Sequence, residues 1–167
     1  MQRTSRPRAE RRQPPAVPAL DAGLRYLALR AHSRLELRRK LERKGYESTE
    51  IDAAMARLAE LGYLDDAAFA RGIVRQRSAT RGPRALAAEL SAKGIDRAGI
   101  ADALAGDDPE SQLVAATRLA ERLYAEKPPP GYREMLNRIG SKLVRRGFSI
   151  EVARAACLAV LAGDIDA

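Results

Sequence analysis

The side chains that could support acid–base or nucleophilic chemistry are few in this 167-residue sequence. His32 is the only histidine and directly precedes a predicted helix cap, so we expect a local structural role for it. Cys157 is the only cysteine and falls on an alanine-rich helix, so we expect it in the core. Asp65 and Asp66 open a predicted helix, where capping and the helix dipole explain them. Because adjacent helical positions diverge by about 100°, these two carboxylates make a poor general acid/base pair.

Other sequence signals narrow the class of protein further. The chain has no GxxxxGK phosphate loop, and a lone cysteine makes neither an internal disulfide nor a zinc site. No apolar run reaches the ~18 residues of a membrane span, and no apolar stretch follows the N-terminal arginines to make a secretory signal. We therefore predict a non-enzymatic, cytoplasmic protein without catalytic residues, metal or cofactor, in which any ATP dependence comes from a partner.

Binding of anions is the chemistry that the basic residues could perform. The stretch LRRKLERKGY at residues 37–46 holds five cations in ten residues. On a helical wheel, Leu37 and Leu41 define the buried direction, and Arg39 and Arg43 point nearly opposite. Two interpretations stay open, namely a solvated helix face supported by an i,i+4 ion pair and a contact surface for phosphates or carboxylates.

The basic residues recur in separate patches along the chain. The third copy of the pattern described below carries Lys142, Arg145 and Arg146, whereas the second has alanine and serine there and is basic earlier, at Arg75 and Arg77. This spacing predicts several patches and no single recognition helix. The candidate contacts are Arg34, Arg38, Arg39, Arg43, Arg75, Arg77, Arg145 and Arg146.

The elements that carry these arginines are predicted to be helices. Alanine, leucine, arginine and glutamate dominate the sequence, and all are strong helix formers. Apolar residues make up 46% of the chain and aromatic residues 4%, so we expect a core of aliphatic side chains. The net charge of +8 favours an anionic partner, such as nucleic acid or an acidic protein surface. Residues 1–19 carry half of that charge together with four prolines, which predicts a disordered tail.

One pattern occurs three times after the tail. An aliphatic residue is followed four positions on by another and four further on by glycine, then by a large apolar residue and a further helical stripe. The three glycines fit helix ends that need positive φ. A helix precedes each copy; the first of these is expected over 20–31, with Leu24, Leu27 and Leu29 giving it an apolar side. Ser33 with Glu36 predicts a capping box at the next helix. The aliphatic–aliphatic–glycine sets, each with its following residue, are Leu37/Leu41/Gly45/Tyr46, Leu86/Leu90/Gly94/Ile95 and Ile139/Leu143/Gly147/Phe148.

The sequence therefore predicts an all-α fold, a tandem array of three three-helix repeats that is elongated and curved. The expected boundaries are 1–19 for the tail and 20–62, 63–107 and 108–167 for the repeats. Two helices joined at a glycine also resemble a helix-turn-helix reader of DNA. Because the third helices here are alanine-rich and weakly charged, base-specific readout is not expected.

Three segments together resemble the RecX family of bacterial recombination regulators: AHSRLELRRKLERKGY, LGYLDDAAFARGIVRQR and KLVRRGFS. The resemblance covers roughly residues 20–163. It implies tandem three-helix repeats, no enzymatic activity, and binding along the groove of the RecA filament in recombination, DNA repair and the SOS response. It further implies modulation of RecA, usually inhibition of its ATPase and strand exchange, and some members also bind single- or double-stranded DNA. The sequence departs from the family in its arginine- and proline-rich tail and in the second helix of repeat two, which lacks extra basic residues.

A mechanism for such a protein follows from the repeats. A curved monomeric array would touch several filament protomers at once, so weak contacts would add up through multivalency. Occupying the groove would block a second duplex and restrain protomer motion. Two alternatives stay open: a DNA-binding protein that acts through phosphates, with a steep salt dependence, and an interaction scaffold for an unrelated partner.

Overall fold

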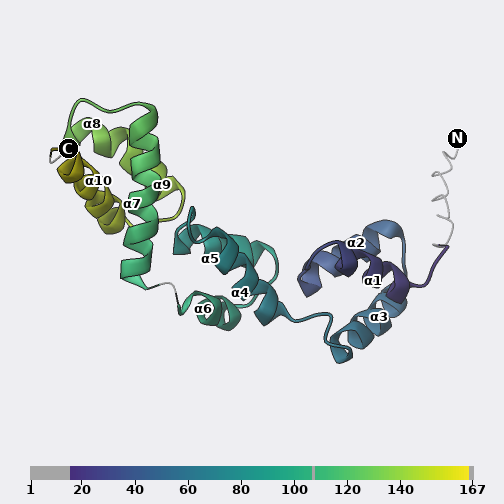
Figure 1. The fold of residues 1–167 in the computed structure, drawn as a ribbon. Helices are drawn as coiled ribbons and strands as arrows, with labels where there is room; N and C mark the ends of the chain where they lie inside the picture. The colour runs from purple at the N-terminus through teal and green to yellow at the C-terminus, as the bar shows by residue number, and fades with distance from the viewer. Residues whose placement is uncertain (1–15, 107, 166–167) are drawn as a thin grey trace, which may run out of the picture. The chain divides into compact units, whose positions relative to one another are not determined.

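Helices make up all the regular structure of the residues described by this computed structural model, which are 16–106 and 108–165 (Figure 1). The all-α prediction is confirmed over these ranges. The predicted disordered tail lies mostly outside the described residues. The chain divides into two compact units, of which one ends at Leu64 and the other begins at Asp65.

The first unit contains one three-helix repeat, called repeat 1 here. Its helices are α1 (Ala19–Leu29), α2 (Arg34–Lys44) and α3 (Ser48–Glu60). Tyr46, the residue after the first glycine, is buried, and its hydroxyl donates to the carbonyl of Val17 at 2.8 Å. Tyr46 therefore packs in the core, as its repeated position predicted. The core of repeat 1 is formed by Ala19, Ala22, Leu37, Leu41, Tyr46, Ile51, Ala54, Met55, Leu58 and Leu64.

Helix α1 packs through small residues beside Leu24 and Leu27, which contact the core as predicted, whereas the prediction that Leu29 lies on the same apolar side is wrong. Leu29 is 83% exposed at the last position of the helix, whereas Ala22 and Gly23 are buried. A Cβ at Gly23 would lie 2.8 Å from Leu58 Cδ1, so glycine lets α1 approach α3 closely. Because α1 and α3 approach closely through small residues, the Leu29 side chain at the end of α1 lies outside their contact.

The ends of the helices follow the predicted signals. The Ser33 hydroxyl accepts from the Glu36 amide at 3.1 Å, and the Glu36 carboxylate accepts from the Ser33 amide at 3.4 Å, which confirms the capping box. The Asp65 carboxylate accepts from the Ala68 amide at 2.9 Å and caps α4. The three repeated glycines all adopt positive φ at helix ends, with values of 91°, 84° and 94° for Gly45, Gly94 and Gly147.

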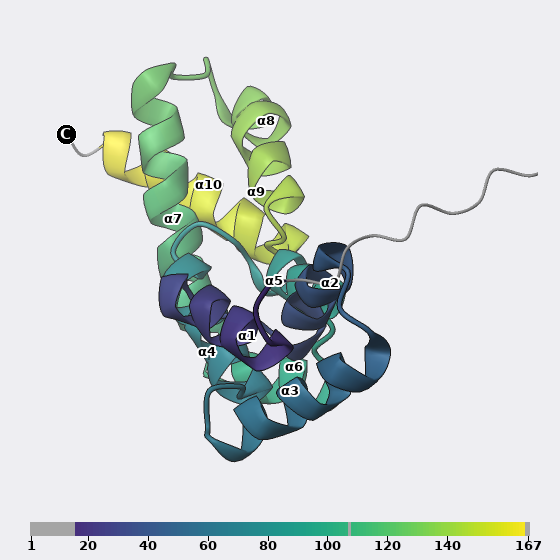
Figure 2. The same ribbon diagram turned by 90° about the vertical axis from the view of Figure 1, so that its right-hand side faces the viewer.

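The second unit contains two sets of helices. Repeat 2 consists of α4 (Asp66–Arg77), α5 (Pro83–Ala92) and α6 (Arg97–Leu104). Repeat 3 begins with α7 (Pro109–Glu126) and ends with α10 (Ile150–Ile165), which lie side by side in both views (Figures 1 and 2). Between them, α8 (Tyr132–Met135), η1 (Leu136–Gly140) and α9 (Ser141–Arg145) follow one another without a break and form one helix. The described residues thus form nine helical segments in three sets of three.

The middle helix of repeat 3 contains a π-helical turn that the sequence did not reveal. The Ser141 amide donates to the Leu136 carbonyl, five residues back, so this turn holds one residue more than an α-helical turn. The apolar spacing from Ile139 to Leu143 to Gly147 starts only within this turn. The apolar spacing that predicted this helix therefore gave no sign of the π-helical turn.

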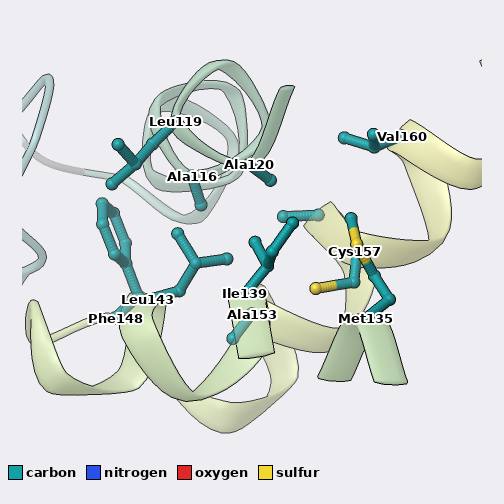
Figure 3. Close-up of a cluster of buried hydrophobic side chains, with 11 residues drawn as sticks. Ala116, Leu119, Ala120, Met135, Ile139, Leu143, Phe148, Ala153, Cys157 and Val160 are labelled. Atoms are coloured by element: carbon teal, nitrogen blue, oxygen red, sulfur yellow. The ribbon is translucent and has the colours of Figure 1, made fainter. Parts of the chain in front are cut away.

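The core of repeat 3 joins α7, the middle helix and α10 (Figure 3). Side chains of α7, such as Leu119, face Leu143 and Phe148 across the core. Cys157 is fully buried among them, and burial raises the pKa of its thiol. The prediction that Cys157 belongs to the core is confirmed.

Repeats 2 and 3 are joined by backbone contacts within the second unit. The Gly82 amide donates to the Arg146 carbonyl at 2.9 Å, and the Arg84 amide donates to the Gly147 carbonyl at 3.3 Å. A Cβ at Gly82 would lie less than 3.0 Å from the Gly147 backbone, and a Cβ at Gly147 less than 3.0 Å from the Ala85 amide nitrogen. We call residues 80–85 with 146–148 the inter-repeat junction, and only glycine fits at its two closest positions.

Candidate functional site

Helix α2 presents the arginines of the opening basic stretch. Leu37 and Leu41 are fully buried, while Arg39 and Arg43 are exposed on the other side of the helix. The predicted facing of α2 is therefore confirmed. Neither Arg39 nor Arg43 has an acidic partner among the residues that the structure describes. Arg34 is also exposed, in the first turn of the helix.

Arg38 differs from its neighbours on α2 because it forms an ion pair with Asp52 of α3. The side chain of Asp52 lies more in solvent than that of Arg38. Exposed pairs of this kind contribute only about 0.2–1 kcal/mol. Arg38 could therefore exchange its carboxylate for another anion at small cost.

A shallow cationic cleft lies between α1 and α2. Lys40 Nζ stands 4.6 Å from the centroid of the Tyr26 ring, within the range of a cation–π interaction. Arg43 and Lys44 complete the lining of this cleft, which has a volume of about 190 Å³. The two lysines were not among the candidate contacts. Their place in the basic stretch was the signal available for them, whereas the involvement of Tyr26 depends on how α1 packs and had no sequence signal.

The candidates of repeat 2 are in different environments. Arg75 is exposed and has no ion pair within the described ranges. Arg77 and Arg81 both pair with Glu89 of α5, the latter at 2.9 Å. The side chain of Glu89 is only 14% exposed, so these two arginines neutralise a carboxylate that water solvates poorly. Arg77 is therefore less available to a partner than Arg75.

The candidates of repeat 3 stand beside the inter-repeat junction. Arg145 is exposed at the last position of α9. Arg146 Nη1 donates to the carbonyl of Thr80 at 3.4 Å, and its own carbonyl accepts from Gly82. The structure thus brings Arg146 to the loop between α4 and α5, close to the arginines that pair with Glu89. It gives no corresponding link between Arg145 and repeat 2.

The residues considered for acid–base chemistry have structural partners. His32 is buried, its Nδ1 lies 2.9 Å from the Arg30 carbonyl, and burial lowers its pKa. A neutral imidazole that donates from Nδ1 to this carbonyl fits the local structural role expected for it. Across 16–106 and 108–165, no cluster of three or more His, Cys, Asp or Glu residues is arranged to hold a metal ion. The helices within those ranges include none that is long and apolar enough to cross a membrane.

The fold and the surface together define a tandem three-helix-repeat protein that presents arginines to solvent. Models of the first and second three-helix domains of RecX match residues 19–58 and 65–104. The regulatory protein RecX of Mycobacterium ulcerans (strain Agy99) is 39% identical over 146 residues, covering 86% of this chain and 84% of the relative. That of Halorhodospira halophila (strain DSM 244 / SL1) is 38% identical over 140 residues, covering 83% and 86%. The chain belongs to the RecX family of regulatory proteins.

Solved structures agree with this assignment. The crystal structure of RecX from Lactobacillus salivarius superimposes with a TM-score of 0.75 at 28% identity, covering 85% of this chain and 94% of that chain. A second crystal structure of a regulatory protein RecX gives a TM-score of 0.73 at 27% identity, covering 80% and 68%. The resemblance noted in the sequence is therefore confirmed, as is the tandem three-helix fold.

Proposed function

We propose that this chain is a non-enzymatic cytoplasmic regulator that binds the RecA filament along its groove as a monomer and inhibits ATP hydrolysis and strand exchange. Membership of the RecX family supports a regulatory role. One observation carries the finer proposal. Among the candidate contacts, each of the three repeats presents at least one exposed arginine that no carboxylate of the described residues neutralises, namely Arg39, Arg43, Arg75 and Arg145.

Cations repeated along a tandem protein suit a polymeric anionic target. A filament offers the same surface on every protomer, so contacts that are individually weak would add through effective concentration. Arg39, Arg43, Arg75 and Arg145 would be the primary contacts because they have no ion pair to break. Arg38 would exchange partners at small cost, whereas Arg77 and Arg146 are held by Glu89 and by the Thr80 carbonyl. Arg34, in the first turn of α2, completes the set of contacts.

The test measures RecA-driven ATP hydrolysis on single-stranded DNA during titration with this protein, with binding to bare DNA measured in parallel. We expect inhibition at protein concentrations well below those that coat bare DNA. The double variant Arg39→Glu with Arg43→Glu should weaken inhibition by about tenfold, because two attractive contacts become repulsive. Arg122→Glu, a reversal at an exposed position of α7, is the matched control and should change inhibition much less. Absence of any effect on RecA below DNA-coating concentrations would reject the proposal.

A second candidate function is sequence-nonspecific binding of DNA. The cleft formed by Tyr26, Lys40, Arg43 and Lys44 favours it, since three cations beside an aromatic ring suit a phosphate backbone with a neighbouring base. Three phosphate contacts on a single strand would give a slope of about −2 for log affinity against log salt. Binding to bare DNA that is as tight as binding to the filament, with this slope, would favour the second candidate over the first.

A further inference from the structure

An open groove lies in repeat 3 between the middle helix and α10. Its volume is about 780 Å³. Aliphatic side chains form its floor, with Leu136 and Val144 from the middle helix and Ile150 and Ala153 from α10. We call this the Val144–Ile150 groove. The proposed filament contacts account for Arg145 at its edge but not for its apolar floor.

Two aliphatic side chains of the groove floor are exposed to solvent. Val144 is 37% exposed and Ile150 is 52% exposed, although both lie close in sequence to core residues. The nearby inward positions, Leu143 and Phe148, already fill the core of repeat 3. Val144 and Ile150 are therefore not needed for the core, and both side chains line the groove, where a ligand can contact them.

The charges on the groove have one sign. Arg145 and Arg154 are the charged side chains that line it. Neither forms an ion pair with another described residue. Glu151 lies one turn before Arg154. Hydrogen bonds from its own amide and from Ser149 lower the pKa of Glu151, with smaller contributions from the charges of Arg84 and Arg154. That carboxylate does not line the groove, so the rim remains cationic.

An apolar floor between two arginines selects among classes of ligand. Single-stranded nucleic acid is bound by aromatic stacking platforms beside cations, and this groove has no aromatic lining residue. An amphipathic helix that lays aliphatic side chains into a groove is a common mode of protein recognition. Carboxylates on such a segment would complement both arginines, and charge complementarity fixes its orientation.

We propose that the Val144–Ile150 groove docks an amphipathic, acidic helical segment of a protein partner. Its aliphatic side chains contact the floor, and its flanking carboxylates pair with Arg145 and Arg154. This docking site is separate from the cationic surface of α2 and does not rest on the identity of the filament as partner.

The test titrates the full chain with a fluorescent helical peptide that has leucines at positions i, i+3 and i+4 and glutamates elsewhere. In the unmodified chain, methyl resonances of Val144 and Ile150 should shift, and glutamine in place of glutamate in the peptide should weaken binding by about tenfold. Arg145→Glu with Arg154→Glu should weaken it by a similar factor. Arg122→Glu and Val114→Ser, exposed positions of α7, are the matched controls and should leave affinity within about twofold.

Several outcomes would overturn the proposal. Equal binding of the glutamine peptide, or methyl shifts elsewhere in the chain, would reject the proposal. Both measurements use the unmodified chain, so neither depends on the folding of a variant. Binding of a single-stranded oligonucleotide or of phosphatidylglycerol vesicles that needs both arginines, while the peptide does not bind, would assign the groove to another class of ligand. Because RecA is absent from this assay, its failure would leave the proposed function untouched.

Discussion

The substitution Gly147→Ala should loosen the inter-repeat junction far more than an ordinary glycine replacement. Gly147 adopts a φ of 94°, and a Cβ there would lie less than 3.0 Å from the amide nitrogen and Cβ of Ala85. The obstructing atoms are backbone and Cβ atoms of α5, which cannot rotate away as a long side chain would. The two helices must therefore separate to admit one methyl group.

The expected cost combines two contributions. A left-handed conformation costs an alanine about 1–2 kcal/mol. Separation of the helices would also break the hydrogen bonds from Gly82 to Arg146 and from Arg84 to Gly147, each contributing about 1 kcal/mol. We therefore expect Gly147→Ala to lower the free energy of unfolding by about 3–4 kcal/mol.

Two further variants separate these contributions. Gly45 adopts a φ of 91°, but a Cβ at this position would meet no other part of the chain within 4 Å, so Gly45→Ala should cost only the conformational part, about 1–2 kcal/mol. Gly82 has an ordinary φ of −78° but the same obstruction, so Gly82→Ala should cost only the lost junction contacts, about 2 kcal/mol. Urea unfolding followed by circular dichroism measures each cost.

Hydrogen exchange locates the effect. The amides of Gly82 and Arg84 should lose protection in Gly147→Ala and in Gly82→Ala, and should keep it in Gly45→Ala. If Gly147→Ala costs no more than Gly45→Ala and both amides stay protected, the two repeats are not closely packed at this point and the reasoning fails.

Three further predictions concern repeat 1. Leu41→Asp should unfold it because Leu41 is fully buried, whereas Arg39→Ala should leave helicity unchanged; circular dichroism showing the reverse would mean that α2 faces the other way. Ser33→Ala should lower stability by about 1 kcal/mol in thermal melts through loss of the N-cap, and an unchanged melting temperature would contradict this. Burial lowers the pKa of His32 below its unfolded value, so the unfolded state binds more protons and stability should fall as pH drops below about 6.5. His32→Gln should flatten that slope between about pH 7.5 and 5.5, and a slope that persists would assign it to other groups.

Much of the fold could be predicted because its signals are local. A capping box needs only Ser33 and Glu36 three positions apart, and a glycine at the end of an apolar stripe needs only its own positive φ. The buried direction of α2 likewise follows from Leu37 and Leu41 alone. The repetition of this pattern made each assignment more secure than one copy would have been.

The parts that were missed depend on contacts between elements. The apolar residues of α1 placed Leu29 on its packed side, whereas the buried contact is made by Ala22 and Gly23 because α3 lies close to them. Which arginines keep a free charge depends on Asp52 and on Glu89, carboxylates that stand 14 and 12 residues from their partners. Long side chains choose such partners only after the helices have packed, so the eight candidates could not be ranked from their spacing.

The inter-repeat junction shows how one repeat position can serve two purposes. In the alignment of repeats 1 and 2, Gly82 stands where repeat 1 has Ser33, and both are helix N-caps. The Ser33 hydroxyl accepts a first-turn amide of its own helix, which a glycine cannot do. In α5, the Gly147 carbonyl of repeat 3 accepts the first-turn amide of Arg84 instead. The loss of the capping side chain is thus what allows the backbone of repeat 3 to approach, and the start of α5 is stabilised by the neighbouring repeat rather than by its own cap. Repeat 1 keeps its own side-chain cap, and repeats 2 and 3, which share this junction, belong to one compact unit.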